Sequence, residues 1–123
     1  MGKPLLIAVV DDDESVRESL PDLLREFGFA VQAFASADAF LASGDIAATH
    51  CLILDIAMPG MCGPELQREL QRRGHPIPVI FITAHGDAAD RPRLIRQGAV
   101  DCLLKPFSEA ALLRALSAAL PVG

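Results

Sequence analysis

Residues 51–60 read C-L-I-L-D-I-A-M-P-G, a short apolar run that stops at an aspartate and is followed by a proline and a glycine. Four consecutive apolar residues are typical of a strand that is buried on both faces of a parallel sheet. We therefore expect Cys51–Leu54 to form an inner strand. Asp55 would then lie at the carboxyl edge of the sheet, where α/β proteins present their functional residues.

Further apolar, β-branched runs of similar length occur on both sides of this strand: Leu5–Val10, Phe29–Phe34, Val79–Thr83 and Cys102–Leu104. Helical patterns separate the runs, and the clearest is Glu14–Phe27, whose apolar residues share one stripe before Gly28. Strands that alternate with helices, each joined by a crossover, predict an α/β fold. We expect a flavodoxin-like doubly wound parallel sheet of five βα units, with strand order 2-1-3-4-5.

Helix boundaries are also indicated by prolines and by polar caps. Pro64 and Glu65 suit the first turn of a third helix, and Ser108 suits the N-cap of a last helix that reaches Leu120. Asp90 is expected to cap the fourth helix. Pro21 falls inside the first helix, where the loss of a backbone bond predicts a kink or a late break.

Length and composition restrict the class of protein. The 123 residues, 51% hydrophobic and 22% charged, fit one globular domain over residues 1–123. The net charge of -5 argues against direct binding to nucleic acid. The three cysteines have no C-x-x-C spacing and no apolar run approaches the ~20 residues of a membrane span, so we expect a cytoplasmic protein with reduced thiols and no membrane contact.

Polar residues follow the predicted strands at their carboxyl ends. Asp11-Asp12-Asp13-Glu14 follows the first strand and Asp55 follows the third, while Thr83 and Lys105 stand at the ends of the fourth and fifth. Clustered carboxylates repel one another unless a cation joins them. A donor set made only of oxygen atoms favours Mg²⁺, with Mn²⁺ as the alternative. The strand ends therefore predict a metal-dependent phosphoryl site.

Four motifs stand in order on these strand ends: V-D-D at Val10–Asp12, D-x-x-M-P-G at Asp55–Gly60, T-A at Thr83–Ala84 and K-P-F at Lys105–Phe107. Together they resemble the receiver domain of two-component response regulators, and the resemblance covers essentially the whole chain. Three stretches resemble the receivers of FixJ-type transcriptional regulators: Ala35–Leu41, Thr83–Asp87 and Gly98–Asp101.

The resemblance implies a role for each matched position. Asp55 would accept a phosphoryl group from a sensor histidine kinase, Thr83 would hydrogen-bond that group, and Lys105 would form an ion pair with it. The implied metal ligands are Asp11 (largely through water), Asp12, Asp55 and the backbone carbonyl of Ala57. A cis bond is expected at Lys105-Pro106. Such a domain is not an enzyme in the ordinary sense, because it catalyses only its own phosphorylation and dephosphorylation.

Cys102 departs from the family pattern, which has a tyrosine or phenylalanine at this position, three residues before the lysine. We therefore expect the signal to pass through Thr83 and the loop Ala84–Ala89, with Cys102 packed alike in both states. The last helix is apolar on nearly all sides, which leaves two readings open. Either it contributes to a homodimer that forms on phosphorylation, or its alanines merely favour helix.

Two other functions compete with this interpretation. Asp11-x-Asp13 after an apolar strand also resembles the nucleophile motif of haloacid-dehalogenase phosphatases, but Phe107-Ser108-Glu109 lacks the second acidic pair of those enzymes. A pseudo-receiver that only binds partners is the second alternative, and the complete set of acids, threonine and lysine argues against it.

Overall fold

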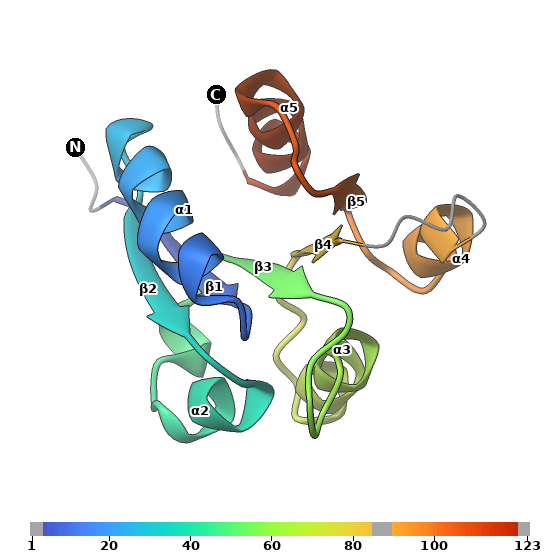
Figure 1. Cartoon of the computed structure of the whole chain (residues 1–123). Helices are drawn as coiled ribbons and strands as arrows, with labels where there is room; N and C mark the ends of the chain where they lie inside the picture. Colours follow the sequence, from blue (N-terminus) through green and yellow to red (C-terminus); the bar gives the residue numbers. More distant parts are fainter. Residues whose placement is uncertain (1–3, 85–89, 121–123) are drawn as a thin grey trace.

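A computed structural model describes residues 4–84 and 90–120 of the chain (Figure 1). The strands are β1 (Leu6–Val10), β2 (Ala30–Phe34), β3 (Cys51–Asp55), β4 (Val79–Thr83) and β5 (Asp101–Leu104). The helices are α1 (Glu14–Glu26), α2 (Ala37–Ala42), the 3-10 turn η1 (Ile46–Ala48), α3 (Gly63–Arg72), α4 (Asp90–Arg96) and α5 (Glu109–Ala119).

The five strands form one parallel sheet in the order β2-β1-β3-β4-β5, as the sequence predicts. The strand order reverses between β1 and β3, which are hydrogen-bonded neighbours. Asp55 is the last residue of β3 and pairs in register with Ile82 of β4. The carboxyl ends of β1, β3 and β4 therefore meet at one edge, where the sequence places its functional residues.

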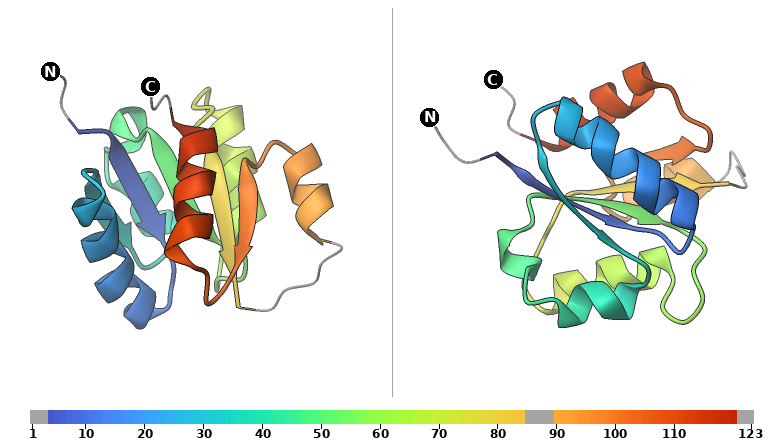
Figure 2. Two further views of the ribbon diagram at one scale, coloured as in Figure 1. Left: turned by 90° about the horizontal axis from the view of Figure 1, so that it is seen from above. Right: turned by 60° about the vertical axis from the view of Figure 1, so that its left-hand side comes forward.

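Helices cover both faces of the sheet (Figure 2). Leu20 and Leu24 of α1 pack with Leu112 and Leu116 of α5 on one apolar cluster, which includes Ile53 of β3. Residues from α2, α3 and α4 pack on the opposite cluster, which includes Leu52 and Leu54 of β3. Because successive side chains of β3 point to opposite faces and all are buried, this strand belongs to both cores.

The expected break in α1 and the expected cap of α4 are wrong. Helix α1 runs without a break from Glu14 to Glu26 although Pro21 lies inside it. Pro21 is itself buried, and its neighbours Leu20 and Leu24 pack in the apolar core, which favours a continuous helix despite the missing N–H. Asp90 is the first residue of α4 and so lies within the helix, where we expected it to be the cap.

Other local expectations are confirmed. Ser108 caps α5, its hydroxyl accepting the Ala111 N–H at 3.0 Å, and Gly28 follows the end of α1 with a φ of 97°. The Lys105-Pro106 peptide is cis. No disulfide bond joins Cys51, Cys62 and Cys102. Of the expected loop Ala84–Ala89, residues 85–89 lie outside the described residues.

Within residues 4–84 and 90–120, none of the helices combines the length and the apolar character that crossing a bilayer requires.

Candidate phosphoryl and metal site

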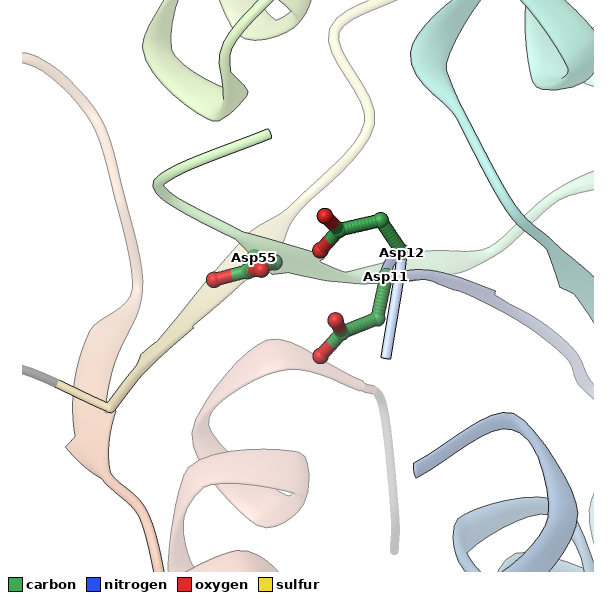
Figure 3. A group of neighbouring side chains, drawn as sticks. All are labelled: Asp11, Asp12 and Asp55. Carbon is green, nitrogen blue, oxygen red and sulfur yellow. The ribbon is translucent and has the colours of Figure 1, made fainter. Parts of the chain in front are cut away.

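Three carboxylates gather at the carboxyl ends of β1 and β3 (Figure 3). Asp11 and Asp12 follow β1 directly, and Asp55 ends β3. One carboxylate oxygen from each of these residues lies within 4.8 Å of the other two. The structure thus brings together the three acidic side chains that the sequence predicts as metal ligands.

Asp11 is fully buried and is held from several sides. Its Oδ1 accepts the Asp13 N–H at 2.9 Å, and its backbone carbonyl accepts a bond from Arg17 Nη1 at 3.0 Å. Its Oδ2 lies 2.7 Å from Lys105 Nζ, yet it receives no well-aligned hydrogen bond within the described part of the chain. This buried Asp11 Oδ2 atom can therefore interact with a second cation in addition to Lys105.

Lys105 joins the site from the end of β5. Its backbone N–H donates to the Thr83 carbonyl at 2.7 Å, which links the loop after β5 to the end of β4. Burial acts to lower the pKa of Lys105, but the close ion-pair contact with Asp11 and the negative charge of Asp55 outweigh it and raise the pKa. The ammonium group therefore stays charged, and in this state its ion pair is with Asp11.

Asp55 lies in an unfavourable environment for a carboxylate. Burial raises its pKa to about 7, and the negative charge of Asp11 acts in the same direction, while Lys105 and a hydrogen bond from the Ala57 backbone act against both. The single positive charge of Lys105 therefore does not compensate the negative charges of the clustered carboxylates. An additional cation between the carboxylates would lower the electrostatic cost of ionising Asp55.

The donor set fits Mg²⁺ or Mn²⁺. All three side chains offer oxygen atoms, and Asp12 and Ala57 are exposed, so solvent reaches the site from their side. Mg²⁺ usually keeps several waters and takes only one or two protein carboxylates with phosphate oxygens. Buried Asp11 and Asp55 with exposed Asp12 supply such a half-open set of ligands.

The raised pKa of Asp55 leads to a pH-dependent stability that Asp55→Asn removes. Between about pH 4 and pH 7 the folded state keeps a proton on Asp55 that the unfolded state has lost, so this residue makes wild type less stable as pH rises through that window. In metal-free buffer, the free energy of unfolding, measured with urea, should rise for Asp55→Asn by roughly 2–4 kcal/mol relative to wild type between these pH values. A difference between the two proteins that does not change with pH would contradict this.

Thr83 is the last residue of β4 and is partly buried at the same edge of the sheet. Its strand neighbour Ile82 pairs with Asp55, so Thr83 follows directly after the residue that pairs with Asp55 in the sheet. The predicted position of Thr83 beside the acidic cluster is therefore consistent with the topology.

Two residues at the site were not predicted from the sequence. Arg17 donates to the Asp11 carbonyl from the first turn of α1, and Gly63 begins α3 directly against the backbone of Asp55. The contact of Arg17 with the Asp11 carbonyl is only weakly indicated by the sequence, through a basic residue in the helix that follows an acidic run. The second could not be found from the sequence, because it depends on how closely α3 approaches β3.

Comparison with known families settles what kind of domain carries this site. The profile of the response regulator receiver domain matches residues 7–117. The chain belongs to the response regulator receiver domain family. Receiver domains are signalling domains of two-component systems that are phosphorylated on an aspartate, interact with sensor kinases and generally bind Mg²⁺ through acidic residues.

Individual relatives agree with this assignment. Response regulator protein TodT of Pseudomonas putida is 46% identical over 115 residues, which cover 94% of this chain and 51% of TodT. Transcriptional regulatory protein FixJ of Azorhizobium caulinodans is 43% identical over 120 residues, or 98% of this chain and 57% of FixJ. The chain spans about half the length of the curated relatives it matches.

A solved structure of response regulator StyR superposes with a TM-score of 0.86 at 48% identity, covering 97% of this chain and 60% of StyR. The receiver fold and the FixJ-type resemblance are therefore confirmed. The comparisons support neither a haloacid-dehalogenase phosphatase nor a pseudo-receiver.

Proposed function

We propose that this receiver domain accepts a phosphoryl group from a sensor histidine kinase on Asp55, with Mg²⁺ as the metal and Mn²⁺ as an alternative. The metal ligands in this proposal are Asp11, Asp12, Asp55 and the carbonyl of Ala57. The observation that carries the proposal is the approach of the three carboxylates to within 4.8 Å, with Lys105 in ion-pair contact at the same point.

In the transfer step, an oxygen of the Asp55 carboxylate forms a bond to phosphorus while the bond between phosphorus and the kinase histidine nitrogen breaks. A divalent ion held by Asp11, Asp12, Asp55 and the Ala57 carbonyl would supply positive charge that neutralises phosphoryl oxygens. Thr83 donates its hydroxyl hydrogen to one of these oxygens, and Lys105 moves from Asp11 to another. Loss of the phosphoryl group to water at the same site completes the only chemistry that the domain carries out on itself.

Incubation with a small phosphodonor and Mg²⁺, followed by intact mass spectrometry and a phosphate assay, tests the function. A receiver accumulates one phosphoryl group per chain. A haloacid-dehalogenase-type phosphatase would release many equivalents of phosphate without a stable adduct, and a pseudo-receiver would do neither. Either of the last two outcomes contradicts the proposal.

We further propose that the signal leaves through Thr83 and the segment after β4. Cys102 packs against the cluster formed with Leu94 and Ala99, and its N–H donates to Asp101 Oδ1 at 2.8 Å. A thiol is too small to fill and vacate a ring-sized space as an aromatic switch residue would. Structures with and without beryllium trifluoride should show Thr83 displaced and Cys102 in one rotamer; a large Cys102 rotamer change would contradict this route.

Homodimerisation on phosphorylation is also part of the proposal. Among the described residues, the exposed large hydrophobic side chains are Ile95, Leu104 and Leu113, which lie on α4, β5 and α5. The outward contribution of α5 is a single leucine, since its other leucines are buried. Sedimentation of the protein with and without beryllium trifluoride shows whether activation causes two copies to associate.

For the whole protein, we propose that residues 1–123 form one receiver domain of a cytoplasmic transcription regulator. The supporting observation is that the transcriptional regulatory proteins FixJ of Azorhizobium caulinodans and Rhizobium meliloti are longer than this chain, which matches 57% and 55% of their lengths. The net charge of -5 favours a role in which this domain does not itself contact DNA.

A further inference from the structure

Gly63 begins α3 at a point of very close contact with β3. Its N–H donates to the Ile56 carbonyl at 3.0 Å, which closes the loop between the two elements. A β-carbon at this position would lie only 2.4 Å from the carbonyl oxygen of Asp55 and 3.1 Å from the Ile56 α-carbon. Both of these atoms are backbone, so no side-chain rotation can relieve the overlap.

Glycine is required at position 63 because there is no space for a β-carbon, and not because of the backbone conformation. Among the described residues, the glycines with positive φ are Gly28, Gly44, Gly60, Gly74 and Gly98, and Gly63 is not one of them. An alanine could therefore adopt the backbone conformation of Gly63, and its entire effect would come from the contact with β3. The third near atom, Phe81 Cε1 at 3.0 Å, belongs to the buried core and leaves little room for α3 to slide.

We propose that Gly63 is a positioning residue that sets the Asp55 carboxylate and the Ala57 backbone relative to each other. The atoms that it contacts belong to the Asp55–Ile56 peptide, and Ala57 follows immediately, with its N–H bonded to the Asp55 carboxylate. Any displacement of this peptide therefore moves the nucleophile and the carbonyl of the proposed metal site together. This inference rests on the proposed function of Asp55.

The start of α3 is also fixed from the solvent side. The Cys62 N–H donates to Glu65 Oε1 at 3.3 Å, and this exposed carboxylate closes the first turn of the helix. Glu65 thus holds the same junction as Gly63 without touching Asp55. A substitution of Glu65 therefore weakens the attachment of α3 at this junction less severely than a substitution of Gly63.

The test compares Gly63→Ala with Gly74→Ala, a matched glycine at the other end of α3. Gly74 has a φ of 81° and open space around its α-carbon, so alanine there costs stability but meets no atom of the site. The rate of phosphorylation by a small phosphodonor is measured by intact mass and divided by the folded fraction from urea unfolding. Mg²⁺ affinity is measured by calorimetry on the same samples.

We expect Gly63→Ala to lose about 10- to 100-fold in rate per folded molecule, as misplacement by an ångström does elsewhere, and to bind Mg²⁺ more weakly. Gly74→Ala should keep the wild-type rate per folded molecule. A Gly63→Ala rate within about twofold of wild type overturns the inference.

If Gly63→Ala is unfolded, trimethylamine N-oxide is added to restore the compact state before the rate is measured. If it stays unfolded even then, an unchanged rate in Glu65→Ala overturns the inference and a lowered rate supports it. Wild type that accepts no phosphoryl group would instead defeat the proposed function, which separates the two failures.

Discussion

Asp55→Asn should abolish the phosphoryl adduct, with a loss of more than about 100-fold in the rate of adduct formation. Asparagine keeps the shape of the side chain at the end of β3, and the pairing of Asp55 with Ile82 uses backbone atoms that the substitution leaves in place. An amide oxygen is a far weaker nucleophile than a carboxylate. Because burial and Asp11 already disfavour the ionised form, removal of the carboxylate should leave the fold intact or more stable.

The control for this experiment is Asp13→Asn. Asp13 lies next to the metal ligands in sequence, but its carboxylate caps α1, accepting the Ser15 N–H at 2.9 Å and the Ser15 hydroxyl at 2.8 Å. Asparagine caps helices as well as aspartate does. Asp13→Asn should therefore form the adduct at nearly the wild-type rate. An adduct that survives in Asp55→Asn would show that another residue is the phosphoacceptor.

Asp11→Asn should give the second largest effect, because this fully buried carboxylate is both a proposed metal ligand and the partner of Lys105. Removal of its charge weakens the attraction for a divalent ion and frees Lys105 to pair with Asp55. We expect Mg²⁺ affinity, measured by calorimetry, to fall by more than about tenfold, and the rate of adduct formation by about 100-fold. Chelation of the metal should have a similar effect on wild type.

The same measurements separate two roles of Asp11. If the residue acts mainly through the metal, raising the Mg²⁺ concentration should restore part of the rate in Asp11→Asn. If it acts mainly by orienting Lys105, the added metal has no effect. Normal Mg²⁺ affinity in Asp11→Asn would contradict the assignment of Asp11 to the metal site, and Asp13→Asn again serves as the neighbouring acid that should change neither quantity.

Much of this architecture is predictable from short-range patterns. Continuous apolar runs such as Cys51–Leu54 specify buried parallel strands, and the topological rules for α/β sheets then place Asp11, Asp55 and Lys105 at one edge. The boundaries that were wrong depend on tertiary contacts. Pro21 is tolerated inside α1 because its surroundings are buried, and local propensity contains no information about that burial.

The site was predictable in its membership but not in its detailed pairing. Motif spacing identifies Lys105 as a cation near the acids, yet only the folded geometry shows its resting partner to be Asp11. Gly63 is a stronger example, because its role follows from the 2.4 Å between its absent β-carbon and the Asp55 carbonyl oxygen. Distances between elements that are set by side-chain packing are not encoded in local sequence patterns.

The most direct test is to locate the phosphoryl group chemically. Borohydride reduces an acyl phosphate and marks the modified aspartate, and trypsin cleavage after Arg17 and Arg25 separates Asp11–Asp13 from Asp55. Asp38, Asp45 and Asp55 lie in one tryptic peptide, and fragmentation of this peptide distinguishes Asp55 from the other two aspartates. The mark should appear on Asp55 alone and only with divalent metal present; a mark on the peptide that ends at Arg17 would contradict the central assignment.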